Sequence, residues 1–127
     1  MLEPTIGRKI IIAGDNSKPD ILDDYLQDLD LLVHECTYTQ EVYDNLAVKV
    51  LHTTAKDLGF TAQQRRVKHL IANHINPRFN KSSNMDIDVI YDEIKSNYRG
   101  RLFIANDFDV YYLDREKLTQ LHTPSSE

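Results

Sequence analysis

Histidine and carboxylate side chains in this chain of 127 residues gather in short polar clusters that follow apolar runs or begin loops. The clusters occupy residues 14–16, 34–37, 52–54 and 74–78, with the sequences GDN, HECT, HTT and HINPR. In an open α/β sheet, side chains leaving the carboxyl ends of strands meet at one edge, where ligands usually bind. The spacing therefore predicts one site assembled from four segments.

His52 is suited to proton transfer, because an imidazole gains and loses a proton near neutral pH. A carboxylate such as Glu35, bonded to one ring nitrogen, would fix its tautomer and support its protonated form. His34 and Glu35 are adjacent, so they point to opposite faces of an extended strand. Only one of these two can face a given cleft, and the other is expected to be structural.

Asp15 and His74 are candidate ligands. Asp15 directly follows an apolar run and a glycine, where it can face a ligand, form an Asx-turn or cap a helix. His74 can coordinate a metal as a neutral imidazole or serve a structural role, and the planar fork of Arg78 matches a phosphate. The combination of Asp15, His52 and His74 at successive element ends favours a shared site.

Alternating strands and helices position these clusters, which predicts a sheet with parallel members joined by right-handed crossovers. Residues 9–14 form an apolar run typical of a strand buried on both faces. Residues 101–105 and 110–113 predict a strand pair or one bent strand. Thr54 is the expected N-cap of its helix. The other expected strands are 31–35 and 67–71, and the expected helices are 19–26, 39–50, 54–64 and 87–98.

The net charge of −5 argues against a chain that binds nucleic acid along its whole surface. Arg65, Arg66 and Lys68 form the tight basic cluster, readable as a solvated helix end or as a local basic patch. Cys36 has no partner for an internal disulfide and is expected to be a buried, inert thiol. Without an apolar segment resembling a signal peptide or membrane span, the expectation is a cytoplasmic protein with no membrane partner.

These motifs resemble the C-terminal half of ribonuclease Z, the tRNA 3′-processing endonuclease family of the metallo-β-lactamase superfamily. The resemblance rests on GDN at 14–16, HECT at 34–37, HTTA at 52–55 and NHINPRF at 73–79, together with ANDF at 105–108. It covers nearly the whole chain. Asn16, Cys36 and Thr53 stand where the family usually has Thr, Ala and Ser, and none of these differences removes a ligand.

The resemblance implies a zinc-dependent phosphodiesterase with two metal ions. Asp15 matches the carboxylate that bridges the two zinc ions, and His74 matches the last histidine ligand. His52 matches the histidine that stabilises the scissile phosphate or protonates the leaving oxygen, with Glu35 as its orienting partner. Two metals and a proton donor suit hydrolysis of a phosphodiester.

Arg78 and Thr54 are the residues expected to bind the substrate, a tRNA precursor in the complete enzyme. The family's H-x-H-x-D-H motif does not occur in this sequence. Zinc hydrolases use about three protein ligands per metal, so the chain alone is expected to bind zinc weakly and to be inactive.

The implied fold class is α/β: half of an αββα metallo-β-lactamase sandwich, a mixed sheet with helices on one face. Residues 1–122 are expected to form this half and residues 123–127 a flexible tail. A lone half would expose a sheet face, which favours a homo-oligomer or pairing with the missing N-terminal half. The alternative function is a non-catalytic α/β module acting as a homodimer or partner-binding subunit; a flavodoxin-like receiver built on Asp15 is a further alternative.

Overall fold

A computed structural model of the chain describes residues 7–14, 19–46, 52–73, 87–106, 108–114 and 117–121. Four strands form a parallel sheet in the order β1-β2-β3-β4, and two more form an antiparallel hairpin. The strands are β1 (Ile10–Ile12), β2 (Leu31–Glu35), β3 (His69–Asn73), β4 (Arg101–Ile104), β5 (Val110–Asp114) and β6 (Lys117–Leu121). The helices are η1 (Pro19–Leu22), α1 (Asp23–Leu26), α2 (Gln40–Asp44), α3 (Ala55–Gln64) and α4 (Ile87–Asn97).

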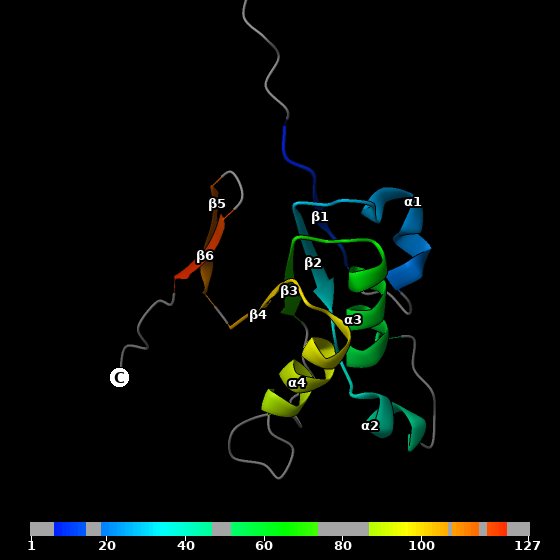
Figure 1. The fold of residues 1–127 in the computed structure, drawn as a ribbon. Helices are drawn as coiled ribbons and strands as arrows, with labels where there is room; N and C mark the ends of the chain where they lie inside the picture. Colours follow the sequence, from blue (N-terminus) through cyan, green and yellow to red (C-terminus); the bar gives the residue numbers. More distant parts are fainter. Residues whose placement is uncertain are drawn as a thin grey trace, which may run out of the picture.

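Helices cover one face of the parallel sheet and the β5–β6 hairpin packs on the other (Figure 1). On the helix side, Leu32, Leu70 and Leu102 of the strands share a buried core with residues of α3 and α4. On the hairpin side, Leu31 and Ile71 pack against Leu118 of β6. The α/β fold class with helices on one face is confirmed, and the parallel and antiparallel pairings lie in two separate sheets.

Helices α3 and α4 approach closely at Gly59. A Cβ atom at this position would lie 2.7 Å from the backbone oxygen of Ile94, so a larger residue would force the two helices apart. Glycine usually weakens a helix interior. Here it permits the contact that packs both helices onto the sheet.

Strand β1 differs from the prediction of a strand buried on both faces. Ile11 packs on the helix-side core, whereas Ile10 is 48% exposed and Ile12 is 76% exposed. β1 is an edge strand that pairs only with β2 within the described sheet. Ile10 and Ile12 pair in register with Leu31 and Val33, so they extend the hairpin-side face beyond the area that the hairpin covers.

Three further features differ from the sequence predictions, two of them at the C-terminal end of the chain. Residues 101–105 and 110–113 do not pair with each other, because β4 joins the parallel sheet and β5 pairs with β6. Strand β6 itself was not predicted. The expected helix over 39–50 is described as far as Asp44, where α2 ends, and residues 47–51 lie outside the described part.

Candidate functional site

Glu35 is the centre of a polar cluster at the carboxyl edge of the sheet. It is the last residue of β2, and its side chain is 1% exposed. One carboxylate oxygen accepts hydrogen bonds from Nδ1 of His52 at 3.2 Å and from the backbone N–H of Thr53 at 2.9 Å. The other accepts from the hydroxyl of Thr37 at 2.5 Å. These hydrogen bonds compensate for the free-energy cost of burying a carboxylate.

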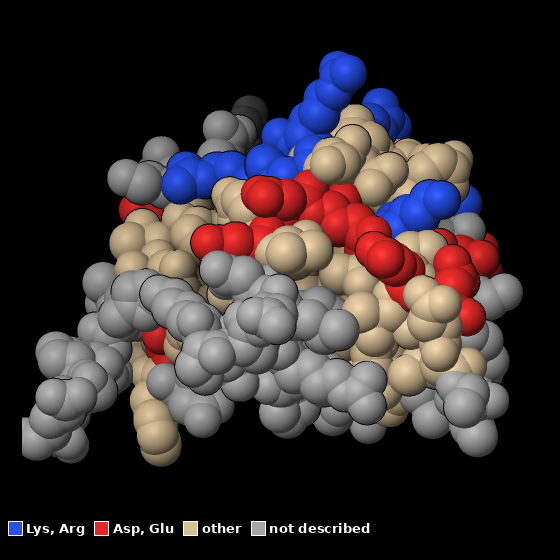
Figure 2. Space-filling view, turned by 90° about the horizontal axis from the view of Figure 1, so that it is seen from below, with Lys and Arg blue, Asp and Glu red and all other residues tan. Residues whose placement is uncertain are grey.

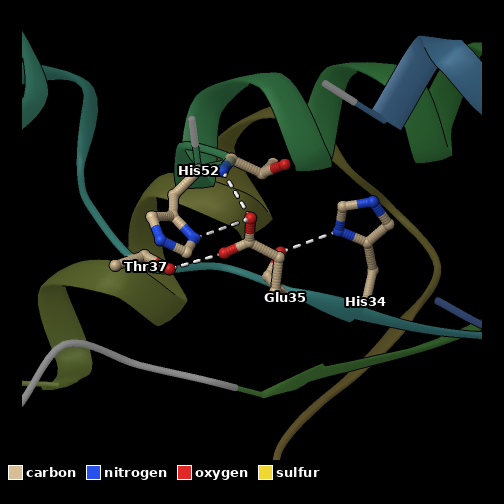
Figure 3. Close-up of polar contacts among 5 residues, drawn as sticks. His34, Glu35, Thr37 and His52 are labelled. Atoms are coloured by element: carbon tan, nitrogen blue, oxygen red, sulfur yellow. Dashed lines mark hydrogen bonds and ion pairs between the residues drawn. The ribbon is translucent and has the colours of Figure 1, made fainter. Parts of the chain in front are cut away.

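His52 lies directly before α3 and points toward Glu35 (Figure 3). Because a carboxylate only accepts hydrogen bonds, this contact assigns the proton to Nδ1 of the ring. The side chain is 24% exposed, and its ring meets Tyr38 edge-on with centroids 6.5 Å apart. The result is an imidazole with a fixed orientation and tautomer that still reaches the surface, which suits a general acid or base.

Of the adjacent residues His34 and Glu35, His34 has the structural role. In Figure 3 its ring lies apart from the ring of His52, with the carboxylate of Glu35 between the two. It is fully buried, and its Nδ1 donates to the backbone oxygen of Glu35 at 2.8 Å. Burial lowers the pKa of His34, and the carbonyl and charge of Glu35 act in the opposite direction. The expectation that only one of the two residues serves the site agrees with this geometry.

Thr54 begins α3 as predicted. Its hydroxyl oxygen accepts from the backbone N–H of Asp57 at 3.2 Å, and its hydroxyl donates to Oε1 of Gln40 at 2.9 Å. The residue is 2% exposed. The helix-cap prediction is therefore confirmed, while substrate binding by Thr54 stays a prediction.

Backbone contacts join the two segments that carry Glu35 and His52. The N–H of Thr37 donates to the oxygen of Thr53 at 3.1 Å, and the N–H of Ala55 donates to the oxygen of Tyr38 at 2.8 Å. Tyr38 and Thr54 form a parallel bridge between these bonds. Residues far apart in the sequence are thus held in one short two-stranded junction.

Asp15, His74 and Arg78 lie outside the described residues, so their predicted roles stay predictions. The described segments that lead toward them end at Gly14 beyond β1 and at Asn73 on β3. Asn73 pairs with Glu35, and its oxygen accepts from the N–H of Cys36 at 2.9 Å. Among the described residues, no three His, Cys, Asp or Glu side chains gather as a metal site.

Thr37 lies in the predicted cluster at 34–37 but had no assigned role, and Gln40 was missed from the sequence. Thr37 is two residues beyond Glu35, and the alternation of an extended strand places both side chains on one face. That spacing is a usable signal. Gln40 had none, because its contact with Thr54 depends on how the starts of α2 and α3 meet in space.

The other candidates from the sequence are distant or inert. Cys36 is fully buried, and burial raises the pKa of its thiol. Arg66 and Lys68 precede β3 at the opposite edge of the sheet, where they pair with Asp28 and Asp30, each at 3.3 Å. In the described ranges, no helix combines the length and apolar character needed to cross a membrane.

The fold places the chain in a known structural class. The metallo-β-lactamase fold protein YhfI from Bacillus subtilis aligns with 76% of this chain and 35% of its own, with a TM-score of 0.59 and 23% sequence identity. The chain therefore has part of the metallo-β-lactamase fold. No protein-family model matches the sequence.

Sequence relatives narrow the class further. Ribonuclease Z of Marinobacter nauticus is 36% identical over 121 residues, which are 94% of this chain and 37% of the relative. Ribonuclease Z of Pseudomonas putida GB-1 is 34% identical over 86% of this chain and 35% of the relative. Ribonuclease Z of Bacillus subtilis is 33% identical over 66% of this chain and 27% of the relative. The chain is homologous to a segment of ribonuclease Z, and it spans 37% or less of these relatives.

Proposed function

We propose that this chain supplies one part of the active site of a zinc-dependent phosphodiesterase of the ribonuclease Z type. The observation that carries the proposal is the buried carboxylate of Glu35 holding Nδ1 of His52 at 3.2 Å, at the carboxyl edge of a metallo-β-lactamase sheet. His52 donates a proton to the leaving oxygen. Glu35 fixes its tautomer and stabilises the positive charge of the protonated ring.

Zinc ligation in this proposal belongs to Asp15 and His74, whose carboxylate and imidazole are ordinary zinc ligands. Glu35 is not assigned to the metal, because both of its oxygens already accept hydrogen bonds. The described residues hold no metal cluster of their own, so further ligands must come from elsewhere. When bound, zinc would supply Lewis acidity at the phosphate.

The proposed substrate is an RNA, and specifically the 3′ trailer of a tRNA precursor. Arg78 is assigned to a phosphate group and Thr54 to the substrate near His52. Figure 2 shows a band of acidic side chains across the end of the molecule where α2 and α4 lie, with Lys and Arg side chains beside the band. In this proposal the surface that grips the RNA belongs to sequence outside this chain, and the working compartment is the cytoplasm.

The site is completed in this proposal by a segment carrying the H-x-H-x-D-H motif, packed against residues 1–122. The exposed Ile10 and Ile12 on the open edge of β1 support such a neighbour, because apolar side chains gain roughly 25 cal/mol per Å² on burial. A second copy of the chain is the alternative occupant. By itself the chain, including the proposed tail 123–127, is expected to have negligible nuclease activity.

Exchanging segments with a relative tests the proposed function. The 121 residues of Marinobacter nauticus ribonuclease Z that align with this chain are replaced by it, and the hybrid is loaded with zinc and given a tRNA precursor. We expect cleavage at the 3′ end, and a loss of about 10²–10⁴ in rate for His52→Ala. A folded, zinc-loaded hybrid without cleavage would support the non-catalytic alternative.

A further inference from the structure

Glu93 of α4 lies against the starts of both α2 and α3. The backbone N–H of Gln40 donates to its carboxylate, at 3.1 Å to one oxygen and 3.4 Å to the other. The backbone N–H and the ammonium group of Lys56 favour the charged form of this carboxylate by lowering its pKa. Gln40 is the first residue of α2, and Lys56 is the second of α3. One carboxylate therefore bonds an N–H in the first turn of α2 and interacts electrostatically with the first turn of α3, where the helix dipole favours negative charge.

These two helix starts directly follow the segments that form the candidate site. Helix α2 begins five residues after Glu35, and α3 begins three residues after His52. The side chain of Gln40 accepts from the hydroxyl of Thr54 at 2.9 Å, which links the two starts a second time. Glu93 is thus connected through Gln40 to Thr54, and from there along the backbone to His52.

Opposing electrostatic effects act on the carboxylate of Glu93, and its charge is not needed for the stability of the fold. Burial raises the pKa of Glu93, and the negative charge of Asp57 acts in the same direction. The N–H groups of Gln40 and Lys56 and the ammonium group of Lys56 lower it. Because burial is the largest of these effects, the charge is held at a desolvation cost. A neutral residue of the same size is expected to change global stability little.

We propose that Glu93 is a positioning residue that sets the arrangement of Glu35 and His52 by clamping the first turns of α2 and α3. The inference rests on the proposed function of that pair. Its geometry, however, is open to test without any nuclease activity. A positioning residue shifts the orientation of the His52 ring, whereas a residue that only stabilises the fold leaves the ring unchanged in the folded molecules.

The test compares Glu93→Gln with Asp92→Asn in the full chain. Asp92 is the exposed neighbour on α4, so its variant removes the same charge without touching the helix starts. Two-bond ¹H–¹⁵N spectra of the imidazoles report which ring nitrogen of His52 carries the proton. We expect the Nδ1–H form in the wild type and in Asp92→Asn, and a mixture of both tautomers in Glu93→Gln. Urea unfolding of each variant is measured in parallel.

An unchanged His52 spectrum in folded Glu93→Gln overturns the inference, whatever the stability of that variant. Should this variant fail to fold, Glu93→Asp takes its place, because the shorter side chain keeps the charge but withdraws the carboxylate from the N–H of Gln40, and it carries the same expectation.

In the active hybrid, Glu93→Gln should lower kcat about tenfold with KM little changed. If His52→Ala loses activity and Glu93→Gln keeps full activity, the positioning role of Glu93 is contradicted, but the proposed function is not. Full activity in His52→Ala contradicts the proposed function instead.

Discussion

Replacing Glu35 by alanine should destabilise the chain far more than replacing His52, although His52 is the proposed proton donor. Glu35 accepts three hydrogen bonds from a position that is 1% exposed. His52 makes one of these three bonds and is 24% exposed. Glu35 therefore contributes more to the stability of the fold than His52 does.

The expected magnitudes follow from the hydrogen bonds that each substitution removes. Glu35→Ala removes the acceptor of the buried Thr53 N–H, which costs about 1–3 kcal/mol, and two further bonds worth about 1 kcal/mol each. Together these bonds amount to about 3–5 kcal/mol. His52→Ala removes one bond and an edge contact with Tyr38, for about 1 kcal/mol.

Urea unfolding followed by circular dichroism measures both variants, with equal m-values as the condition for comparing their free energies. Asp92→Ala on the exposed side of α4 is the control and should stay within about 0.5 kcal/mol of the wild type. Equal losses for the two variants, or a larger loss for His52→Ala, would refute the argument that Glu35 organises this cluster.

Three further predictions concern the elements around the site. Gly59→Ala should lower the free energy of unfolding by about 1–2 kcal/mol in urea titrations, since the clash with the Ile94 oxygen outweighs the better helix propensity; greater stability would contradict the close packing of α3 and α4. Thr54→Ala should cost about 1 kcal/mol by the same assay and Thr54→Ser much less, because serine keeps the cap. The folded chain lowers the pKa of His34 below its ordinary 6.5, so protons bind more readily to the unfolded chain and stability should fall as the pH drops through about 6.5. In thermal unfolding between about pH 7.5 and 5.5, His34→Asn should show a weaker pH dependence, and an identical dependence would exclude this role.

The parts of the fold predicted from sequence are those specified by local pattern. An apolar run leading into His34 and Glu35 predicted β2, and the period of an extended strand predicted that these two side chains diverge. Thr54 before a helical pattern predicted the start of α3. In each case the determining interaction lies within a few residues along the chain.

Errors arose where the determining neighbour is distant. The apolar run of β1 predicted burial on both faces, but composition does not specify how many neighbours a strand has, and Ile12 is 76% exposed. Strand β6 carries Leu118 and Leu121 at a spacing that does not alternate, and its pairing with β5 defines it as a strand. The contact of Glu93 with Gln40 spans 53 residues and follows only from the packing of α4.

The most direct test is the single-turnover cleavage rate of the ribonuclease Z hybrid with His52→Ala. The matched control is His122→Ala, at a histidine that lies outside the four polar clusters of the sequence. We predict a rate reduced by about 10²–10⁴ for His52→Ala, because the leaving oxygen loses its proton donor. We predict an unchanged rate for His122→Ala. Equal cleavage by the two variants would contradict the assignment of His52 and, with it, the proposed function of this chain.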